Sequence, residues 1–371
     1  MVDSPLRPAK SRNYIPTLDG WRAIAVILVI FHHDKILHFK GMNTEWLYYH
    51  GPYGVTIFFA ISGLLICSRL LDEERVQGRI HIGGFYIRRA CRILPAAMAY
   101  LGVIGALGLA SVIPVTGREW VTSLFFCRNI NTLSFTPGHR QWYTGHFWSL
   151  AVEEHFYLLL PSILFFTPKR FRLPVMTGTA VLIAAWRILV PRYLPTLISW
   201  SRTDLRINEL WVPAIFAILL TMPGARKLLE RIVWIWPLIA VGLIYLLTET
   251  PYDNIYTALL GYVGMPLILL GTVLRPESLF GRFLELAPMR WVGKVSYSIY
   301  LWQELFFTGH YLPDRGPLAA ARYSPLRWAC LFVLATLSYY FIEKPMVRLG
   351  NRWAPPATPG RPEEVVKPIE G

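Results

Sequence analysis

The first apolar segment of the chain is bordered by residues that can do chemistry. Every residue from Ala23 to Phe31 is apolar, and Arg22, His32 and His33 border that run. An α-helix advances about 100° per residue, so Arg22 and His33 fall within roughly 20° of one face, whereas His32 lies about 100° away. Ionisable side chains in a membrane helix are costly and usually serve a function. The alternative at this point is a structural polar pair buried between helices.

Three arginines precede the third apolar segment and could bind an anion. Helical spacing predicts that Arg88 and Arg92 share one face, with Arg89 beside them. Guanidinium groups bond phosphates bidentately, so a cluster of this kind at a membrane boundary suits a phosphorylated ligand. Anionic lipid headgroups would satisfy the same residues equally well. These three residues alone do not separate the two interpretations.

A further group of ionisable residues opens the fourth apolar segment. On a helix His146, Ser149 and Glu153 share a face, and Glu154 adjoins them. A carboxylate and a histidine at the mouth of a membrane span can bind sugar hydroxyls or orient a base. The alternative is an interfacial aromatic belt that includes Trp148, with ordinary polar caps. Two adjacent carboxylates beside a histidine are more than a belt needs.

Polar and small residues also occur inside two other apolar segments. Ser62 and Gly63 are small enough to let two helices approach closely, and packing is the favoured interpretation of this pair. A later segment carries a polar stripe near one helical face, which should point into a helix bundle: Ser296, Tyr300, Gln303 and Glu304.

The composition identifies a membrane protein. The chain has 371 residues, of which 54% are hydrophobic and 16% are charged, whereas soluble domains carry roughly 25% charged residues. Apolar runs long enough to cross a bilayer recur along it. We therefore expect an all-α polytopic integral membrane protein with about ten transmembrane helices. Its predicted spans are 20–38, 54–71, 90–113, 147–167, 174–190, 208–222, 231–248, 253–274, 293–310 and 324–347.

The charge distribution predicts the orientation of the chain. The net charge is +14, but the lysines and arginines concentrate in those connecting segments that lie on the side of the N-terminus. This pattern fits two cytoplasmic termini and gives no reason to expect nucleic acid. We expect a basic cytoplasmic leader over 1–17, a membrane domain over 18–350 and a disordered cytoplasmic tail over 351–371. The spacing of the four cysteines indicates neither a disulfide framework nor a metal site.

Five short blocks along the chain, taken together, resemble a known family. They are Arg-x10-His at 22–33, Phe-Phe-x-x-Ser-Gly at 58–63, Arg-Arg-x-x-Arg-x-Leu-Pro at 88–95, Trp-Ser-Leu-x-x-Glu-Glu at 148–154 and Ser-Tyr-Ser-x-Tyr-Leu-Trp at 296–302. Each block is weak singly, but their order is specific. The chain thereby resembles the acyltransferase 3 family of membrane-bound O-acyltransferases, which modify bacterial O-antigen, nodulation factors, exopolysaccharides and macrolides.

The resemblance implies an activity and a location. A member of this family takes an acyl group, here expected to be acetyl, from cytoplasmic acyl-CoA and passes it to a hydroxyl of a sugar or glycan of the cell envelope. The expected location is the bacterial inner membrane. The chain departs from the family pattern at His155, where members often have Gln, and at Gln303, where many have His.

The resemblance also suggests roles for the residues singled out above. The family's motif histidine matches His33, which we expect to act as general base, with Glu153 or Glu154 orienting it or holding the acceptor. The residues expected to bind acyl-CoA are Arg22, Arg88, Arg89 and Arg92. The residues expected to contact the acceptor are His146, Trp148, Ser149, Tyr300 and Gln303.

The expected partners are acyl-CoA, a carbohydrate or glycoside acceptor and membrane lipids, with no metal and no nucleic acid. The oligomeric state is not readable from the sequence. The main alternative is a transporter or flippase of a lipid-linked or small-molecule glycoside. It predicts inverted repeats and helices broken near the membrane midplane, and the sequence displays neither repeats nor paired Gly or Pro interruptions.

Overall fold

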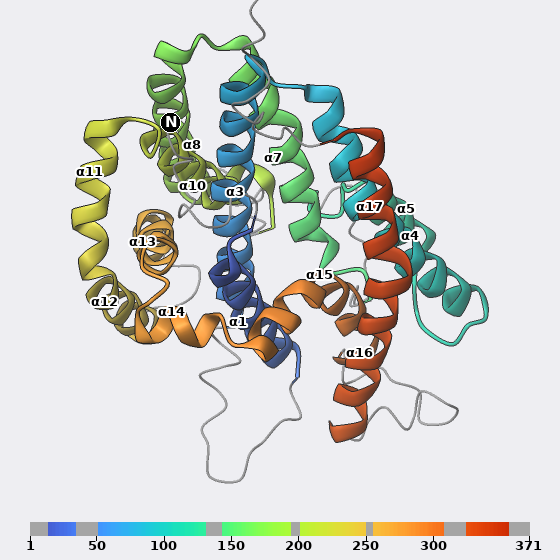
Figure 1. The fold of residues 1–371 in the computed structure, drawn as a ribbon. Coiled ribbons are helices and arrows are strands. Elements are labelled where there is room, and N and C mark those ends of the chain that lie inside the picture. Colours follow the sequence, from blue (N-terminus) through green and yellow to red (C-terminus); the bar gives the residue numbers. More distant parts are fainter. Residues whose placement is uncertain are drawn as a thin grey trace, which may run out of the picture.

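Helices form every regular element in the part of the chain that the computed structural model describes, which is 14–34, 51–130, 143–193, 201–249, 255–307 and 324–355 (Figure 1). The α-helices are α1 (Pro16–His33), α3 (Tyr53–Gln77), α4 (Ile82–Leu109), α5 (Gly117–Leu124), α7 (Phe147–Phe166), α8 (Lys169–Tyr193), α9 (Thr203–Arg206), α10 (Asn208–Leu219), α11 (Pro223–Ile232), α12 (Trp236–Glu249), α13 (Ile255–Leu274), α14 (Leu279–Leu284), α15 (Ala287–Phe307), α16 (Ser324–Ser338) and α17 (Lys344–Trp353). A 3₁₀ turn, η2 (Val233–Ile235), joins α11 to α12, and a π-helical turn, η4 (Tyr339–Glu343), joins α16 to α17.

The predicted membrane architecture is confirmed. Six helical stretches of the described chain are long and apolar enough to cross a bilayer: Tyr53–Gln77, Ile82–Leu109, Phe147–Phe166, Lys169–Val190, Pro223–Tyr245 and Pro325–Trp353. The four remaining predicted spans coincide with α1, α10, α13 and α15. The protein is therefore an all-helical polytopic membrane protein. Most of the predicted leader and tail lies outside the described residues.

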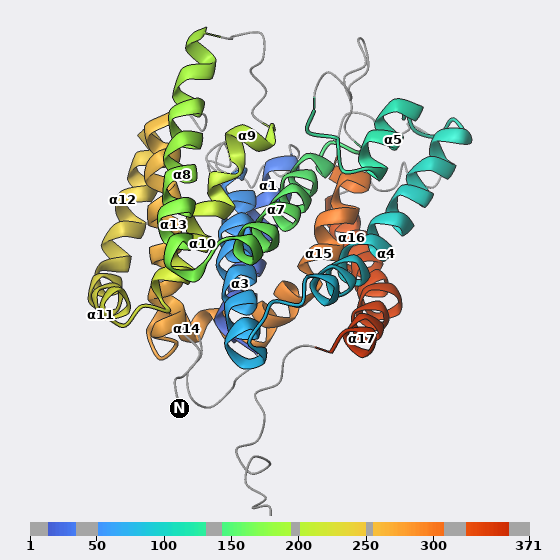
Figure 2. The same ribbon diagram turned by 90° about the horizontal axis from the view of Figure 1, so that it is seen from above.

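Helices α1 and α3 lie in the middle of the bundle (Figures 1 and 2). Helix α15 packs along α1, and α10 packs along α3. The helices α8 and α10 to α13 gather on one side of this central pair, and α4, α5, α7, α16 and α17 gather on the other. Helices α1 and α3 therefore contact one set of helices on one side and another set on the other.

Glycines allow the central helices to touch through their backbones. A Cβ atom at Gly293 of α15 would collide with the backbone carbonyl of Asp19 on α1, and one at Gly63 of α3 would collide with the carbonyl of Leu210 on α10. The packing role predicted for Gly63 is confirmed. Small residues such as these glycines let helix backbones approach closely and pack in lipid, where no hydrophobic force acts between helices.

A buried ion pair fixes the end of α1 that carries the histidines. Arg327 Nη2 of α16 lies 2.6 Å from Asp34 Oδ1, and both side chains are 0% exposed. The indole Nε1 of Trp328 donates to Asp34 Oδ2 at 3.0 Å. Because a buried carboxylate needs such partners, the backbone next to His33 is tied to the start of α16.

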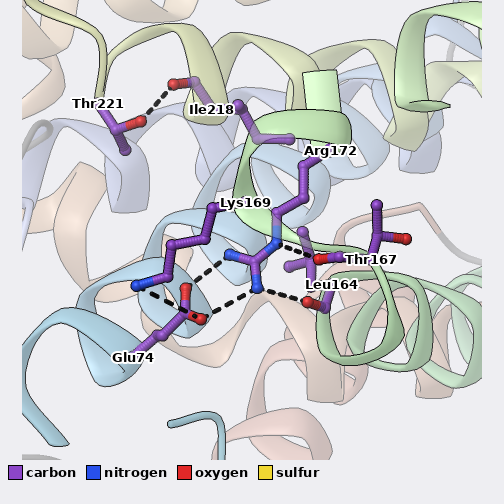
Figure 3. Close-up of polar contacts among 7 residues, drawn as sticks. All are labelled: Glu74, Leu164, Thr167, Lys169, Arg172, Ile218 and Thr221. Carbon is purple, nitrogen blue, oxygen red and sulfur yellow. Dashed lines mark hydrogen bonds and ion pairs between the residues drawn. The ribbon is translucent and has the colours of Figure 1, made fainter. Parts of the chain in front are cut away.

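A second cluster ties the far end of α3 to the turn between α7 and α8 (Figure 3). Arg172 makes a two-pronged pair with Glu74, with N–O distances of 2.6 and 3.0 Å, and also donates to the carbonyls of Leu164 and Thr167. Lys169 Nζ lies 3.7 Å from the same carboxylate, but its side chain is 71% exposed. Arg172 is therefore the residue that holds the end of α3 against the turn between α7 and α8.

Replacing Gly293 by Ala should destabilise the protein. The added methyl group meets the Asp19 carbonyl, and overpacking of this kind costs about 1–3 kcal/mol. Gly178→Ala on α8 is the matched control, because a Cβ there meets nothing within 4 Å. Thermal unfolding of the detergent-purified proteins should show a lower midpoint for Gly293→Ala only. Equal midpoints for the two variants would contradict the close contact between α1 and α15.

Removing Arg172 should cost more stability than removing Lys169. Arg172→Ala removes the two-pronged partner of Glu74 and a donor to two carbonyls, and within the described residues leaves the carboxylate only the distant, exposed Lys169, which should cost about 3 kcal/mol. Lys169→Ala removes an exposed ion pair and should cost below about 1 kcal/mol. Thermal unfolding of both variants measures the difference. A larger loss of stability for Lys169→Ala would show that the exposed Lys169, and not Arg172, holds α3 against the turn between α7 and α8.

Candidate active site

His33 forms a pair with a buried carboxylate at the end of α1. Its Nε2 lies 3.1 Å from Oε1 of Glu304 on α15, and its Nδ1 lies 2.8 Å from the carbonyl of Val29. A neutral ring that donates from Nδ1 to that carbonyl has its lone pair on Nε2. Nε2 is then the basic atom, and it faces Glu304. The ring of His32 stands edge-on to that of His33, with centroids 5.0 Å apart.

A buried histidine lies on the same side of α15 as Glu304. The ring of His146 is 5.2 Å from Tyr100 and 5.6 Å from Tyr300, centroid to centroid, and Tyr300 lies one helical turn before Glu304 on α15. The Tyr300 hydroxyl donates to the His146 carbonyl at 3.2 Å and lies 2.5 Å from Ser149 Oγ. We call the group formed by His33, Glu304, His146, Tyr300 and Ser149 the histidine end of the site.

Several polar atoms around the histidine end have no hydrogen-bond partner within the described residues. They include both ring nitrogens of His146, both side-chain heteroatoms of Gln303, and Oε2 of Glu304. Buried polar groups are nearly always hydrogen-bonded, and the exceptions often mark a site where water or a ligand binds. The histidine end therefore offers unused donors and acceptors to a polar molecule.

A pocket with about 710 Å³ of empty space adjoins the histidine end. We call it the arginine pocket, because Arg22 of α1 and Arg89 and Arg92 of α4 contribute to its wall. Ser149 and Tyr300 also line it, and these two residues belong to the histidine end. The pocket therefore connects three guanidinium groups to the neighbourhood of His33.

Acidic and aromatic groups hold the charged side chains of the pocket. Arg22 pairs with Asp19 at 2.9 Å, and the Arg89 guanidinium lies over the ring of Tyr157, 5.4 Å from its centroid. Glu153 accepts hydrogen bonds from Ser62 at 2.8 Å and from Tyr157 at 3.3 Å. Three arginines that face one cavity can bind an anionic group such as a phosphate.

A tyrosine outside the membrane segments completes the surroundings of Arg22. The Tyr14 hydroxyl donates to Asp19 at 2.6 Å and accepts from Arg290 at 3.2 Å. Burial and the hydrogen bond to Asp19 raise the pKa of Tyr14 above its ordinary value. Tyr14 therefore remains a neutral donor at physiological pH.

The arginine cluster is arranged differently from the sequence prediction. Arg88 does not line the pocket; its guanidinium pairs with Glu73 at 3.1 Å and donates to the carbonyl of Ala354 at 3.2 Å. The structure therefore separates Arg88 from Arg22, Arg89 and Arg92, and the predicted role of Arg88 in binding acyl-CoA stays a prediction. The residues that face the pocket together are Arg89 and Arg92, three positions apart, because α4 is rotated so that Arg88 meets α3 and α17.

Glu153 and Glu154 were expected to orient His33 or to hold the acceptor; the structure places another carboxylate beside His33, and the acceptor role stays a prediction. The carboxylate beside His33 is Glu304, whereas Glu153 faces Ser62 and Tyr157 in the arginine pocket. Glu154 is not among the residues that line the pocket. The sequence offered no means of choosing between carboxylates on different helices.

The other predicted acceptor residues divide into two groups. His146, Ser149, Tyr300 and Gln303 are all buried, and the first three meet at the histidine end. Trp148 lies on another side of α7, where it packs edge-on against Phe59 and under the Arg206 guanidinium, which is 5.3 Å from its ring centroid.

Four residues of the site had no assigned role in the sequence interpretation: Asp19, Ser62, Tyr157 and Glu304. Glu304 belonged to the predicted polar stripe of α15, and Ser62 to the block around Gly63. The signal that could have found them is polarity inside an apolar span. Among the described residues, no three His, Cys, Asp or Glu side chains come together as a metal site would require.

Comparison with known proteins gives consistent matches. A family model described as an acyltransferase domain matches residues 15–343. The O-acetyltransferase OatA of Staphylococcus aureus (strain NCTC 8325) is 29% identical over 363 residues, which is 92% of this chain and 58% of that protein. The peptidoglycan O-acetyltransferase OatA of Listeria monocytogenes is 28% identical over 365 residues, which is 92% of this chain and 57% of that protein.

The matches have two further properties. The chain spans less than two thirds of the length of these relatives. No solved structure matches the chain.

Proposed function

The chain belongs to the acyltransferase 3 family, and we propose that it is an O-acyltransferase embedded in the bacterial inner membrane. In this proposal it transfers an acetyl group from cytoplasmic acetyl-CoA to a sugar hydroxyl of a cell-wall glycan. The names of its relatives, O-acetyltransferase and peptidoglycan O-acetyltransferase, support the acetyl group and the glycan.

One observation carries the proposal. The arginine pocket reaches from Arg22, Arg89 and Arg92 to Ser149 and Tyr300, and Tyr300 lies on α15 one helical turn before Glu304, the partner of His33. An anionic carrier can thus bind at the arginines while its acyl end extends towards the half-buried imidazole of His33. The same separation would let the acceptor reach the base from the opposite end.

The chemistry at His33 is a direct acyl transfer. The acceptor hydroxyl donates its proton to Nε2 as its oxygen attacks the thioester carbonyl carbon; a C–O bond forms, the C–S bond breaks and the thiolate leaves. The proton then passes from the imidazolium to the thiolate, which leaves as free CoA thiol. Glu304 lies at the same nitrogen, 3.1 Å from Nε2, where its carboxylate stabilises the cationic ring that forms when Nε2 takes the proton.

The wall of the pocket provides the donors that the transfer needs. The hydroxyls of Ser149 and Tyr300 line the pocket and bond to each other and to the His146 carbonyl. A hydroxyl that turns away from that carbonyl can donate to the oxyanion that develops on the thioester carbonyl. His146 and Gln303 have unused hydrogen-bonding atoms within the described residues, which suits them to bind the acceptor's hydroxyls.

The orientation follows from the same assignment. Acyl-CoA is made in the cytoplasm, so the arginine side of the pocket would face the cytoplasm and His33 would lie nearer the outer face. The concentration of lysine and arginine in the connecting segments on the side of the N-terminus supports this orientation. Both termini would then be cytoplasmic.

Removing His33 should abolish transfer. General acid–base catalysis contributes about 10²–10⁴-fold, so His33→Ala should lower acceptor-dependent thiol release from acetyl-CoA at least about 100-fold. Glu304→Gln keeps the shape of the side chain but loses its charge, and should lower kcat while leaving KM for acetyl-CoA nearly unchanged. Purified protein with a soluble peptidoglycan fragment as acceptor allows the measurement.

His32→Ala is the matched control, because it removes the neighbouring imidazole from the same helix end. It should retain most of the activity. Retained transfer in His33→Ala together with loss in His32→Ala would overturn the assignment of the base. Uptake of acceptor without consumption of acetyl-CoA would favour a transporter.

The donor site can be tested separately at the arginines. Arg89→Gln and Arg92→Gln each remove one cation from the pocket, and a lost charge-assisted hydrogen bond is worth about 1.5–3 kcal/mol. KM for acetyl-CoA should therefore rise about tenfold or more in each. The same variants should leave KM for the glycan fragment unchanged.

Arg88→Gln provides the comparison, since Arg88 pairs with Glu73 outside the pocket. It should lower the thermal midpoint but leave KM for acetyl-CoA unchanged. An effect on KM as large as that of Arg89→Gln would show that the pocket does not define the donor site.

A further inference from the structure

A second cavity lies on the other side of the central helices. It has about 1070 Å³ of empty space, including the space that is open to the surroundings. Trp21, Ile24 and Leu28 of α1 line it, together with residues of α3, α8 to α10, α12 and α13. The proposed transfer does not use this cavity.

The wall of the cavity is divided into an apolar part and a charged part. The residues contributed by α1 and α12 are all apolar, and so are those of α13 except for Tyr262. The residues contributed by α8, α9 and α10 are all charged: Arg187, Arg206 and Glu209. A ligand that matches this wall has a long apolar part and a polar head.

The charged part of the wall is buried and organised. Arg187 Nη1 donates to the Tyr262 hydroxyl at 2.7 Å, and Arg206 Nε lies 3.0 Å from Glu209 Oε1. These three charged side chains are at most 4% exposed. Glu209 Oε2 has no hydrogen-bond partner within the described residues. The two guanidinium groups can bind a phosphate, and the unused Glu209 oxygen can accept from a hydroxyl, so the charged part of the wall suits a headgroup that carries both.

The cavity has a wall that reaches the outer surface of the bundle. Ile244 of α12 lines the cavity and is also 51% exposed. Its neighbours Val241 and Tyr245 are 64% and 63% exposed, so this apolar face of α12 meets the lipid of the membrane. A hydrocarbon chain can therefore enter sideways from the bilayer, whereas water gains little from an apolar wall.

We propose that this cavity binds one hydrocarbon chain of an anionic membrane lipid. The lipid phosphate lies beside Arg187 and Arg206, and a head-group hydroxyl donates to Glu209. Basic pockets between transmembrane helices recognise anionic lipid headgroups in this way. The bound chain packs against Trp21 on α1, the helix that also carries Arg22 into the arginine pocket, so the lipid supports the central helices from their second side.

The experiment is native mass spectrometry of the delipidated full chain, titrated with palmitoyl-oleoyl phosphatidylglycerol. Gly261→Phe fills the cavity, because Gly261 lines it and a Cβ there meets nothing within 4 Å. Gly242→Phe on α12 is the matched control, since a Cβ there is equally unobstructed and Gly242 is not in the cavity wall. Phosphatidylcholine with the same acyl chains tests whether binding depends on the lipid headgroup, because its headgroup has no hydroxyl donor and no net negative charge.

Wild type and Gly242→Phe should each retain one phosphatidylglycerol, and Gly261→Phe should lose it, with occupancy at least tenfold lower at the same lipid concentration. Phosphatidylcholine should bind wild type at least tenfold more weakly. Equal retention by Gly261→Phe and wild type would overturn the proposal, as would equal loss in both glycine variants or equal binding of the two lipids. If Gly261→Phe unfolds, Ala258→Leu replaces it, because Ala258 also lines the cavity and leucine fills less of it. Its phosphatidylglycerol occupancy is then compared with that of wild type in the same way. Since no transfer is measured, failure here leaves the proposed function untouched.

Discussion

The fully buried pair between Asp34 and Arg327 is the interaction on which the site depends. A charge inside a membrane protein is tolerated only with a partner, and breaking such a pair costs several kcal/mol. Asp34 follows His33 directly, so its position fixes the end of α1 against α16. With that end held, the imidazole can meet Glu304 on α15 at hydrogen-bond distance.

Helix α1 sets the spacing between the two parts of the site. Arg22 and His33 are eleven residues apart, which is about 16 Å of helix. Because both belong to one rigid helix, the anion-binding end and the basic end keep their separation. The contact between Gly293 and Asp19 then brings α15, with Tyr300 and Glu304, alongside that helix.

Much of the fold was predictable from the sequence because apolar length is a strong signal in membrane proteins. Each predicted span coincides with a helix, and Gly63 packs as its size indicated. The site was predictable only in part. Arg22 and His33 were predicted because ionisable residues stand out in an apolar segment, and the structure places Arg22 in the pocket and His33 beside Glu304. Arg88 was grouped with Arg92 on spacing alone and faces Glu73 instead.

The sequence by itself determined the class of protein, the helices and the polar residues that had to be buried, since these follow from local hydropathy and helical period. Only the tertiary structure decided which buried groups meet. That Glu304 rather than Glu153 faces His33, and that Arg89 and Arg92 share a pocket without Arg88, depends on how each helix is rotated. Rotation is fixed by contacts between residues far apart in the chain, such as Gly293 with Asp19 and Arg327 with Asp34, and no local pattern encodes those contacts.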